Sequence, residues 1–129
     1  MTRLLLDTHV LLWAAWRSPR LSQQADALIR DPENEKLFSV VSLWEIAIKL
    51  ALGRSDLVLD IVALRDGLLV NAYTELPILA GHALMTARLP AIHKDPFDRL
   101  LVAQALEQKL TLLTADPVVA SYSAAIMRV

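Results

Sequence analysis

Short apolar runs alternate with longer amphipathic segments along this chain, and this alternation constrains the fold more than any other feature. Three runs have the length and composition of buried strands: RLLLD at 3–7, KLFSV at 36–40 and LTLLT at 110–114. The predicted helices cover residues 9–16, 21–31, 42–53, 60–68, 77–89 and 95–109. Residues 71–77 are predicted as a further strand or extended link, and 125–129 as a last edge strand. This order favours an α/β fold with a mainly parallel central sheet covered by helices on both faces.

The composition restricts the cellular setting and the partners of the chain. Its 129 residues suit one domain, which we predict to span 1–129. The absence of cysteine is usual in a reducing compartment. A formal net charge of −1 predicts no overall basic field for nucleic acid, although a local basic patch would be compatible with it. Because no apolar run approaches the roughly 20 residues of a membrane span, we predict a cytoplasmic protein without membrane contact.

The apolar share of the sequence is somewhat above average. Hydrophobic residues make up 55% of the chain, and three of them are tryptophans: Trp13, Trp16 and Trp44. Two interpretations are open for these tryptophans. They belong to the core, or they contribute to a surface that a partner covers.

Four acids stand at the ends of predicted strands or at the starts of the helices that follow. They are Asp7, Glu45, Asp98 and Asp116. Asp7 ends the first strand and Asp116 follows the strand at 110–114, whereas Glu45 and Asp98 lie in first turns of predicted helices. The carboxyl ends of parallel strands meet at one edge of a sheet, where open α/β folds bind their ligands. We therefore expect the four acids to converge there.

Asp98 has an unusual position within its predicted helix. It shares a helical face with three apolar residues at offsets of three, four and seven positions, which are Leu101, Val102 and Ala105. The polar stripe of the same helix lies on the other side and is predicted to be exposed: Gln104, Glu107 and Gln108. A carboxylate that points with core-facing residues indicates a binding pocket.

Some of these acids also have an alternative structural role at a helix end. Ser42 and Glu45 match a capping box, and Glu45 with Lys49 forms an i,i+4 ion pair. Asp95 and Asp116 each precede a proline and are therefore expected N-caps. Capping does not require a carboxylate to face an apolar stripe, and it leaves Asp7 without an obvious role.

A cluster of carboxylates needs compensation for its charge. Two unit charges about 4 Å apart repel by roughly 4 kcal/mol at an effective dielectric constant near 20. A bound cation removes this repulsion, and oxygen ligands without histidine or cysteine favour Mg²⁺ or Mn²⁺ over Zn²⁺. Such a site would hydrolyse phosphodiester bonds with a metal-activated water.

Four segments together resemble the PIN-domain ribonucleases, and more narrowly the VapC-type toxins of type II toxin–antitoxin systems. They are LLLDTHVLLWA, SVVSLWEIAIK, HKDPFDRLLVAQAL and LTLLTADP, and they extend from residue 4 to residue 117. The resemblance implies an α/β/α sandwich, which is a three-layer fold with a parallel sheet. It also implies a metal-dependent endoribonuclease that leaves a 5′-phosphate and a 3′-hydroxyl.

The resemblance assigns roles to particular residues. It implies that the acidic set named above is both catalytic and metal-binding, with Mg²⁺ or Mn²⁺ as cofactor. Thr8 and Thr114 match hydroxyl residues that orient an acid or a water. Asp95 is an N-cap or an outer residue of the site. Lys49 and Arg99 either contact the phosphate and balance the acids, or pair with Glu45 and Asp95 respectively.

The resemblance also implies partners. These are a cognate antitoxin whose tail occupies the acidic groove, often with an arginine, a second copy of the chain in a homodimer, and transfer or ribosomal RNA as substrate. The alternative from another class is a module that binds RNA or the antitoxin and has little catalytic activity. Loss of activity with retention of the fold, on replacement of one acid, separates the two.

Other acidic or nucleophilic enzymes match the sequence poorly. A receiver domain needs a pair of acids after the first strand, and an Asp-x-Asp phosphatase needs an acid where this chain has His9. The chain has no G-x-S-x-G elbow of a serine hydrolase. His9, His82 and His93 lack the spacing of zinc ligands, and we predict that they are surface or turn residues.

Overall fold

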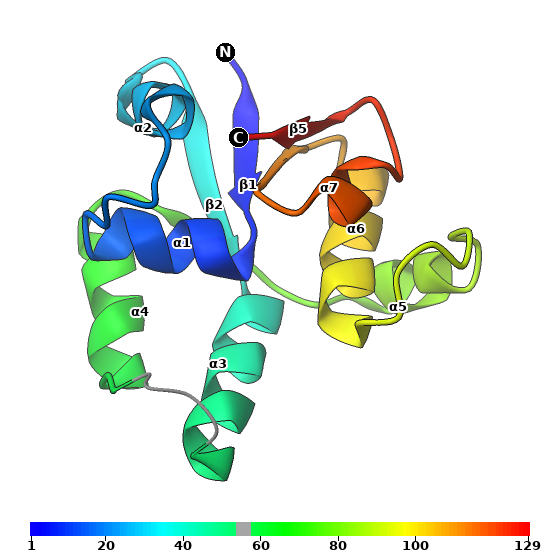
Figure 1. Ribbon diagram of the computed structural model, residues 1–129, viewed down its shortest axis with the longest axis horizontal. Coiled ribbons are helices and arrows are strands. Elements are labelled where there is room, and N and C mark those ends of the chain that lie inside the picture. The colour runs from blue at the N-terminus through cyan, green and yellow to red at the C-terminus, as the bar shows by residue number, and fades with distance from the viewer. Residues whose placement is uncertain (54–57) are drawn as a thin grey trace.

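A parallel sheet of five strands lies at the centre of the computed structural model, which describes residues 1–53 and 58–129 (Figure 1). The strands are β1 (Arg3–Leu6), β2 (Glu35–Ser39), β3 (Thr74–Leu76), β4 (Thr111–Thr114) and β5 (Ile126–Arg128). Their order is β3-β2-β1-β4-β5, and every neighbouring pair is parallel. The last strand is therefore an edge strand, as predicted.

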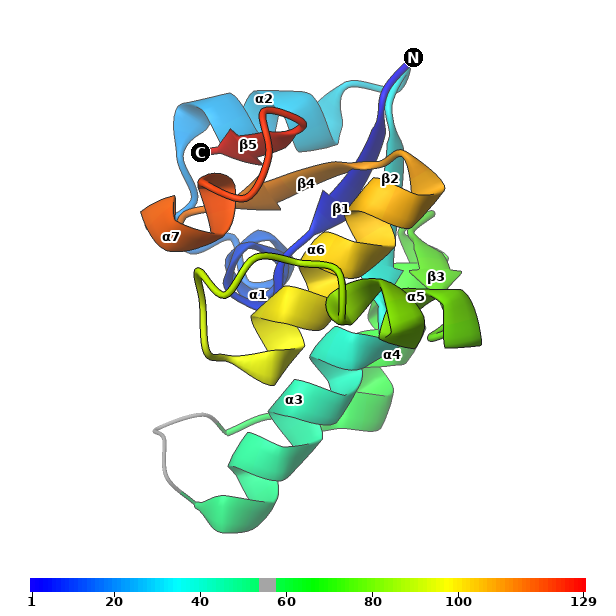
Figure 2. The same cartoon turned by 90° about the vertical axis from the view of Figure 1, so that its right-hand side faces the viewer.

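Helices cover both faces of this sheet. They are α1 (Thr8–Ala15), α2 (Gln23–Arg30), α3 (Val40–Leu52), α4 (Ile61–Val70), α5 (Ala80–Thr86), α6 (Pro96–Gln108) and α7 (Pro117–Ala120). Helices α1, α2 and α4 lie on one side, and α5, α6 and α7 lie on the other, while α3 extends away from the end of β2 (Figures 1 and 2). The predicted three-layer α/β/α architecture is confirmed.

The side chains of β1 show how the sequence forms these layers. Successive residues of a strand point to opposite faces. Leu4 and Leu6 accordingly pack in the cluster that includes α1 and α4, whereas Leu5 packs in the cluster that includes α6. All three are fully buried, which explains why this strand is a continuous apolar run rather than an alternating one.

The chain reverses its direction of travel across the sheet between β1 and β4. It runs from β1 to β2 and then β3, crosses back over the other face through α5 and α6, and continues outward through β4 and β5. The helices that follow β1 and β4 therefore lie on opposite faces. Such a switch point leaves a crevice at the carboxyl ends of the two strands, and this is where open α/β sheets bind ligands.

The start of α3 differs from the prediction. The hydroxyl of Ser39 accepts a hydrogen bond from the Val41 N–H at 3.0 Å, and this N-cap starts the helix at Val40. The predicted capping box of Ser42 and Glu45 is therefore wrong, because both residues lie inside the helix. Glu45 stands in the second turn rather than the first. The helix ends as predicted before Gly53, which has a φ of +60°.

The start of α5 also differs from the prediction, which began this helix at Pro77. The first helical residue is Ala80. The Leu79 N–H donates to Nδ1 of His82 at 3.1 Å, so a histidine ring caps this end. The prediction that His82 is a surface or turn residue is wrong, because the side chain is fully buried.

Gln104 is the clearest departure from the predicted pattern of α6. Its side chain is 0% exposed, although helical periodicity assigns it to a polar, solvent-facing stripe. Its Oε1 accepts from the Ser39 hydroxyl at 2.6 Å, and its Nε2 lies 3.2 Å from the Pro77 carbonyl oxygen and 3.3 Å from His82 Nδ1. Because α5 packs on α6, two faces of α6 are buried, and Gln104 connects α6 to β2 and to the segment before α5.

Replacement of Gln104 by alanine is expected to lower the free energy of unfolding by about 2 kcal/mol, because buried partners lose their hydrogen bonds. Chemical denaturation monitored by circular dichroism measures the change. The matched control is Gln23→Ala at an exposed position of α2, for which a change within about 0.5 kcal/mol is expected. Equal effects of the two replacements would contradict the role of Gln104.

Two of the three tryptophans lie at the surface of the protein. Trp16 and Trp44 are 50% and 52% exposed, so the core interpretation is wrong for these two. Trp13 is partly buried and packs against the cluster that includes α1. Among the described residues, no helix is long and apolar enough to cross a membrane.

Candidate active site

The carboxyl ends of β1 and β4 each carry one of the predicted acids. Asp7 directly follows β1, and its backbone N–H donates to the Leu113 carbonyl oxygen of β4 at 3.0 Å. Its side chain also caps α1, where Oδ1 accepts from the Val10 N–H at 2.9 Å. Asp116 follows β4 and caps α7, and its Oδ1 accepts from the Val118 N–H at 2.8 Å. These two acids therefore flank the switch point of the sheet.

Thr114, the last residue of β4, contacts both of these acids. Its hydroxyl accepts a hydrogen bond from the backbone N–H of Asp116 at 3.1 Å. The Thr114 side chain also favours the charged form of the Asp7 carboxyl and lowers its pKa. Thr114 is fully buried, so the strand holds the hydroxyl in a fixed position between the two acids.

Asp7 is only 5% exposed, and this burial determines its ionisation. Desolvation raises the pKa of the Asp7 carboxyl above its ordinary value, and the charge of Glu45 adds to the increase. The hydrogen bonds from Thr114 and Val10 and the charge of His9 lower the pKa and partly offset this effect. Burial is the largest contribution, so the site disfavours negative charge on Asp7.

Glu45 reaches the same region from α3, and its two oxygens have different partners. The hydroxyl of Thr8, the first residue of α1, donates to Oε1 at 2.7 Å and lies 3.0 Å from the Ser42 hydroxyl. Lys49 forms an ion pair with Oε2 at 2.8 Å. The sequence therefore correctly predicts the Lys49–Glu45 pair, whereas the position of Ser42 beside Thr8 was not predicted.

Asp98 points into the same region from the first turn of α6. Burial raises the pKa of its carboxyl to about 7, the charges of Asp95, Glu45 and Asp7 contribute to the increase, and His93 lowers the pKa. Three of the predicted acids thus act on one another electrostatically. Burial and the charges of the neighbouring acids together disfavour the charged form of Asp98.

Asp95 and Arg99 have structural contacts. Asp95 is the N-cap of α6, with Oδ1 accepting from the N–H groups of Phe97 and Asp98 at 2.8 and 3.3 Å. The guanidinium of Arg99 donates to the carbonyl oxygens of Pro90 and Thr86, both at 2.9 Å. Within the described parts of the chain no ion pair joins Arg99 to Asp95. Arg99 therefore holds the segment between α5 and α6.

His93 lies beside these acids, a position that the sequence pattern did not predict. Its Nε2 lies 3.3 Å from Asp116 Oδ2 and 3.4 Å from Asp98 Oδ2. One ligand atom from each of these three residues falls within 4.8 Å of the others, which is close enough to surround a metal ion. The prediction of a surface or turn histidine is incomplete. The sequence did contain a signal for this position. His93 stands shortly before the N-cap of α6, and the first turn of that helix carries Asp98.

Comparison with known proteins identifies the family. The family model of the PIN domain matches residues 4–124. The chain belongs to the PIN-domain family. A relative, Ribonuclease VapC22 of Mycobacterium tuberculosis, is 31% identical over 117 residues, which cover 90% of this PIN domain and 88% of the relative. The family resemblance of the sequence is thereby confirmed.

Solved structures agree with this assignment. DNA-bound VapBC from Salmonella typhimurium matches with a TM-score of 0.69 at 16% identity, covering 100% of this PIN domain and 98% of that chain. VapBC-5, a member of the VapBC family of toxin–antitoxin systems from Mycobacterium tuberculosis, matches with a TM-score of 0.61 at 26% identity, covering all of both chains. The match to the Salmonella protein, at 16% identity, shows a similar fold and nothing further.

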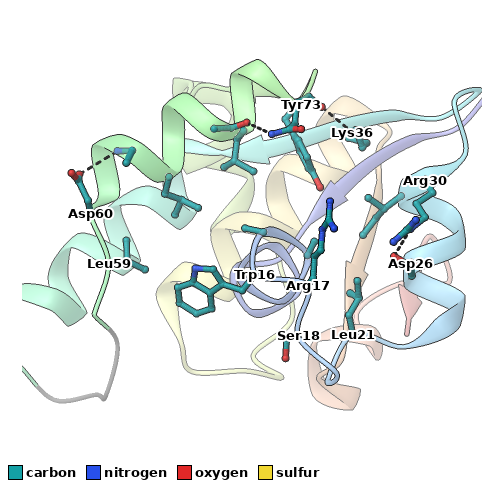
Figure 3. Close-up of a pocket in the computed structure, with 18 of the residues that line it drawn as sticks. Trp16, Arg17, Ser18, Leu21, Asp26, Arg30, Lys36, Leu59, Asp60 and Tyr73 are labelled. Atoms are coloured by element: carbon teal, nitrogen blue, oxygen red, sulfur yellow. Dashed lines mark hydrogen bonds and ion pairs between the residues drawn. The ribbon is translucent and has the colours of Figure 1, made fainter.

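A large hollow of about 1020 Å³ lies on another part of this PIN domain (Figure 3). The end of α1, helix α2 and helix α4 form its walls. Its lining combines apolar side chains such as Trp16 and Leu21 with both charges, for example Arg17 and Asp60. None of the four acids of the switch point lines it, so the hollow is a surface separate from the acidic site.

Proposed function

We propose that this PIN domain is a metal-dependent endoribonuclease and the toxin of a toxin–antitoxin pair. One observation carries the catalytic part of the proposal. At the switch point of the sheet, burial of the Asp98 carboxyl, together with the charges of the neighbouring acids, raises its pKa to about 7. Negative charge is unfavourable at this buried, ligand-binding edge of the sheet. A bound cation would neutralise it, which explains why the fold retains the acids there.

The residues at the site fit a divalent cation of the Mg²⁺ or Mn²⁺ type. The set consists of carboxylates, which are hard oxygen ligands suited to these ions. Asp7, Asp98 and Asp116 would hold the cation, with Glu45 beside them. When bound, the cation would lower the pKa of a water molecule and stabilise the charge on the leaving oxygen of a phosphodiester.

The other residues prepare this set of acids. Thr8 and Lys49 hold the two oxygens of Glu45 through contacts of 2.7 and 2.8 Å. Lys49 also reduces the negative charge there. The Thr114 hydroxyl accepts a hydrogen bond from the Asp116 backbone N–H, and the Thr114 side chain favours the charged form of Asp7. These contacts hold Glu45 and Asp116 without RNA, and such preorganisation supports the proposal of catalysis rather than simple binding.

RNA is the proposed substrate because the relative that covers most of this chain is a ribonuclease. Hydrolysis at such a site would leave a 5′-phosphate and a 3′-hydroxyl. We expect transfer or ribosomal RNA as the target. The contacts that select the cleavage site would come from surface residues outside the acidic set.

A cognate antitoxin is the proposed protein partner. Two similar solved structures are of VapBC proteins, and one of them is described as a member of a family of toxin–antitoxin systems. An antitoxin that places an arginine among these acids would supply the missing positive charge and block the site. The exposed Trp16 on the wall of the hollow supports contact with a protein, either the antitoxin or a second copy of the chain in a homodimer.

Digestion of total cellular RNA by antitoxin-free protein tests the proposal. Discrete fragments are expected with Mg²⁺ or Mn²⁺ and none with EDTA, and ligation-based sequencing is expected to find 5′-phosphates at the new ends. RNA that stays intact with either cation, together with tight RNA binding, would favour the alternative of a binding module with little catalytic activity.

A further inference from the structure

His93 stands between two acids that come from different elements. Asp98 lies in α6 and Asp116 precedes α7, and the imidazole Nε2 is within 3.4 Å of an oxygen of each. Carboxylates brought this close repel each other. A donor between them reduces the repulsion and fixes which oxygen of each carboxylate faces the ring.

The backbone of His93 is held in place from outside the acidic site. Its N–H donates to the Tyr122 hydroxyl at 2.8 Å. The guanidinium of Arg99 donates to the same hydroxyl at 3.1 Å, and Arg99 is itself anchored on the carbonyl oxygens of Pro90 and Thr86. Tyr122 follows α7 and Arg99 belongs to α6, so the two elements that carry the acids also fix the histidine between them.

The hydrogen bonds of the ring determine which of its nitrogens carries the proton. The backbone N–H of Asp95 donates to Nδ1 of His93 at 3.0 Å, so Nδ1 must present a lone pair. The neutral ring then carries its hydrogen on Nε2, which faces the carboxylates. A histidine that ligates a metal has the opposite arrangement, because its second nitrogen usually donates to a carboxylate or carbonyl group. The geometry therefore makes His93 a donor toward the acids and disfavours it as a ligand.

We propose that His93 is a positioning residue of the metal site, which orients Asp98 and Asp116 through its Nε2–H. Each carboxylate has about four lone-pair sites. The contact with His93 uses Oδ2 of both residues and leaves further lone pairs for the cation. This inference rests on the proposed function, and it adds a nitrogen donor to a site that the family resemblance describes by its oxygens.

Two amide replacements of His93 test the roles of its two ring nitrogens separately. Asparagine at position 93 offers a carbonyl oxygen near the place of Nδ1, which keeps the Asp95 contact and removes the donor at Nε2. Glutamine offers an amide N–H₂ group near the place of Nε2. The matched control is Ile92→Ala, since Ile92 is an exposed residue of the same segment.

Calorimetric titration with Mn²⁺ is the first readout, because it requires no cleavage. His93→Asn is expected to weaken Mn²⁺ binding by about 10-fold or more, as is usual for partners of metal ligands. His93→Gln is expected to stay within about 3-fold of the unmodified protein because it restores the donor, and Ile92→Ala is expected to bind normally. Binding by His93→Asn that equals the unmodified protein, or His93→Gln as weak as His93→Asn, would overturn the inference.

Nitrogen chemical shifts of the ¹⁵N-labelled histidine rings provide the second readout. At mildly alkaline pH we expect His93 to carry its hydrogen on Nε2 both without and with saturating Mg²⁺. Transfer of the hydrogen to Nδ1 on addition of Mg²⁺ would identify a ligand and overturn the inference.

The role of His93 and the metal-dependent function can be refuted separately. If the unmodified protein binds Mn²⁺ and cleaves RNA while His93→Asn behaves identically, only the role of His93 is refuted. If the unmodified protein binds no Mn²⁺, the metal-dependent function is refuted and the inference with it. Thermal unfolding of each variant confirms that the comparison is made between folded proteins.

Discussion

Asp98→Asn is expected to reduce RNA cleavage by at least about 100-fold, because a carboxylate that holds the catalytic cation contributes several kcal/mol and each 1.4 kcal/mol changes the rate tenfold. Asparagine keeps the size of the side chain and removes its charge. The fold should survive, since burial and neighbouring negative charges already disfavour the charged form of Asp98 and raise its pKa to about 7. Initial rates of RNA cleavage in Mg²⁺, compared at equal concentrations of folded protein, measure the effect.

Asp95→Asn is the matched control for this experiment. It removes an acid from the same helix start, and asparagine is an equally good N-cap. Because Asp95 contacts the N–H groups of Phe97 and Asp98, we expect a reduction in rate of less than about 10-fold, the lower end of the range for residues that only support a metal site. Equal losses in the two variants, or cleavage that survives Asp98→Asn, would contradict the assignment of Asp98 to the metal site.

The stability of the metal-free protein is expected to fall as the pH rises from 3.8 to about 7. Asp98 has a folded-state pKa above its unfolded value, so over this range the folded state binds the proton more tightly than the unfolded state. Its contribution is fully present below pH 3.8 and is lost as the pH passes about 7. The loss from Asp98 amounts to about 4 kcal/mol at most, at 1.36 kcal/mol per pKa unit. The raised pKa of Asp7 adds a change of the same sign.

Denaturation in EDTA at a series of pH values measures this effect, and Asp98→Asn isolates the residue. The variant lacks the titrating group, so the difference in stability between it and the unmodified protein should increase with pH in favour of the variant. Addition of Mn²⁺ at mildly alkaline pH should stabilise the unmodified protein and affect the variant much less. A constant difference across the pH range would show that Asp98 is not held in a site of uncompensated negative charge.

The sheet and the acids at its edge could be predicted because they depend on local patterns. Apolar runs of four or five residues ended by a turn or an acid fit buried parallel strands, and the carboxyl ends of such strands meet at one edge. Asp7 directly follows β1, and Asp116 follows the end of β4 after Ala115, so topology alone places them at the switch point. The inward direction of Asp98 followed from its spacing to apolar residues in α6.

The errors concern contacts between distant segments. Gln104 looked exposed because helical periodicity describes one buried face, whereas α5 packs on a second face of α6 and buries it. Glu45 was assigned to a first turn because Ser39, the true N-cap, also fits the end of a strand. His93 was overlooked because its contacts with Asp116 and Tyr122 cross 23 and 29 positions of sequence. Arg99 is next to Asp98 in sequence, but its guanidinium contacts Thr86 and Pro90.

The most direct test of the account is a crystal structure of the protein grown with Mn²⁺, with anomalous diffraction data to locate the ion. We predict an anomalous peak within coordination distance of carboxylate oxygens from Asp7, Asp98 and Asp116, at the carboxyl ends of β1 and β4. A Mn²⁺ peak elsewhere on the protein, with none between these three carboxylates, would contradict the assignment of this edge as the catalytic metal site.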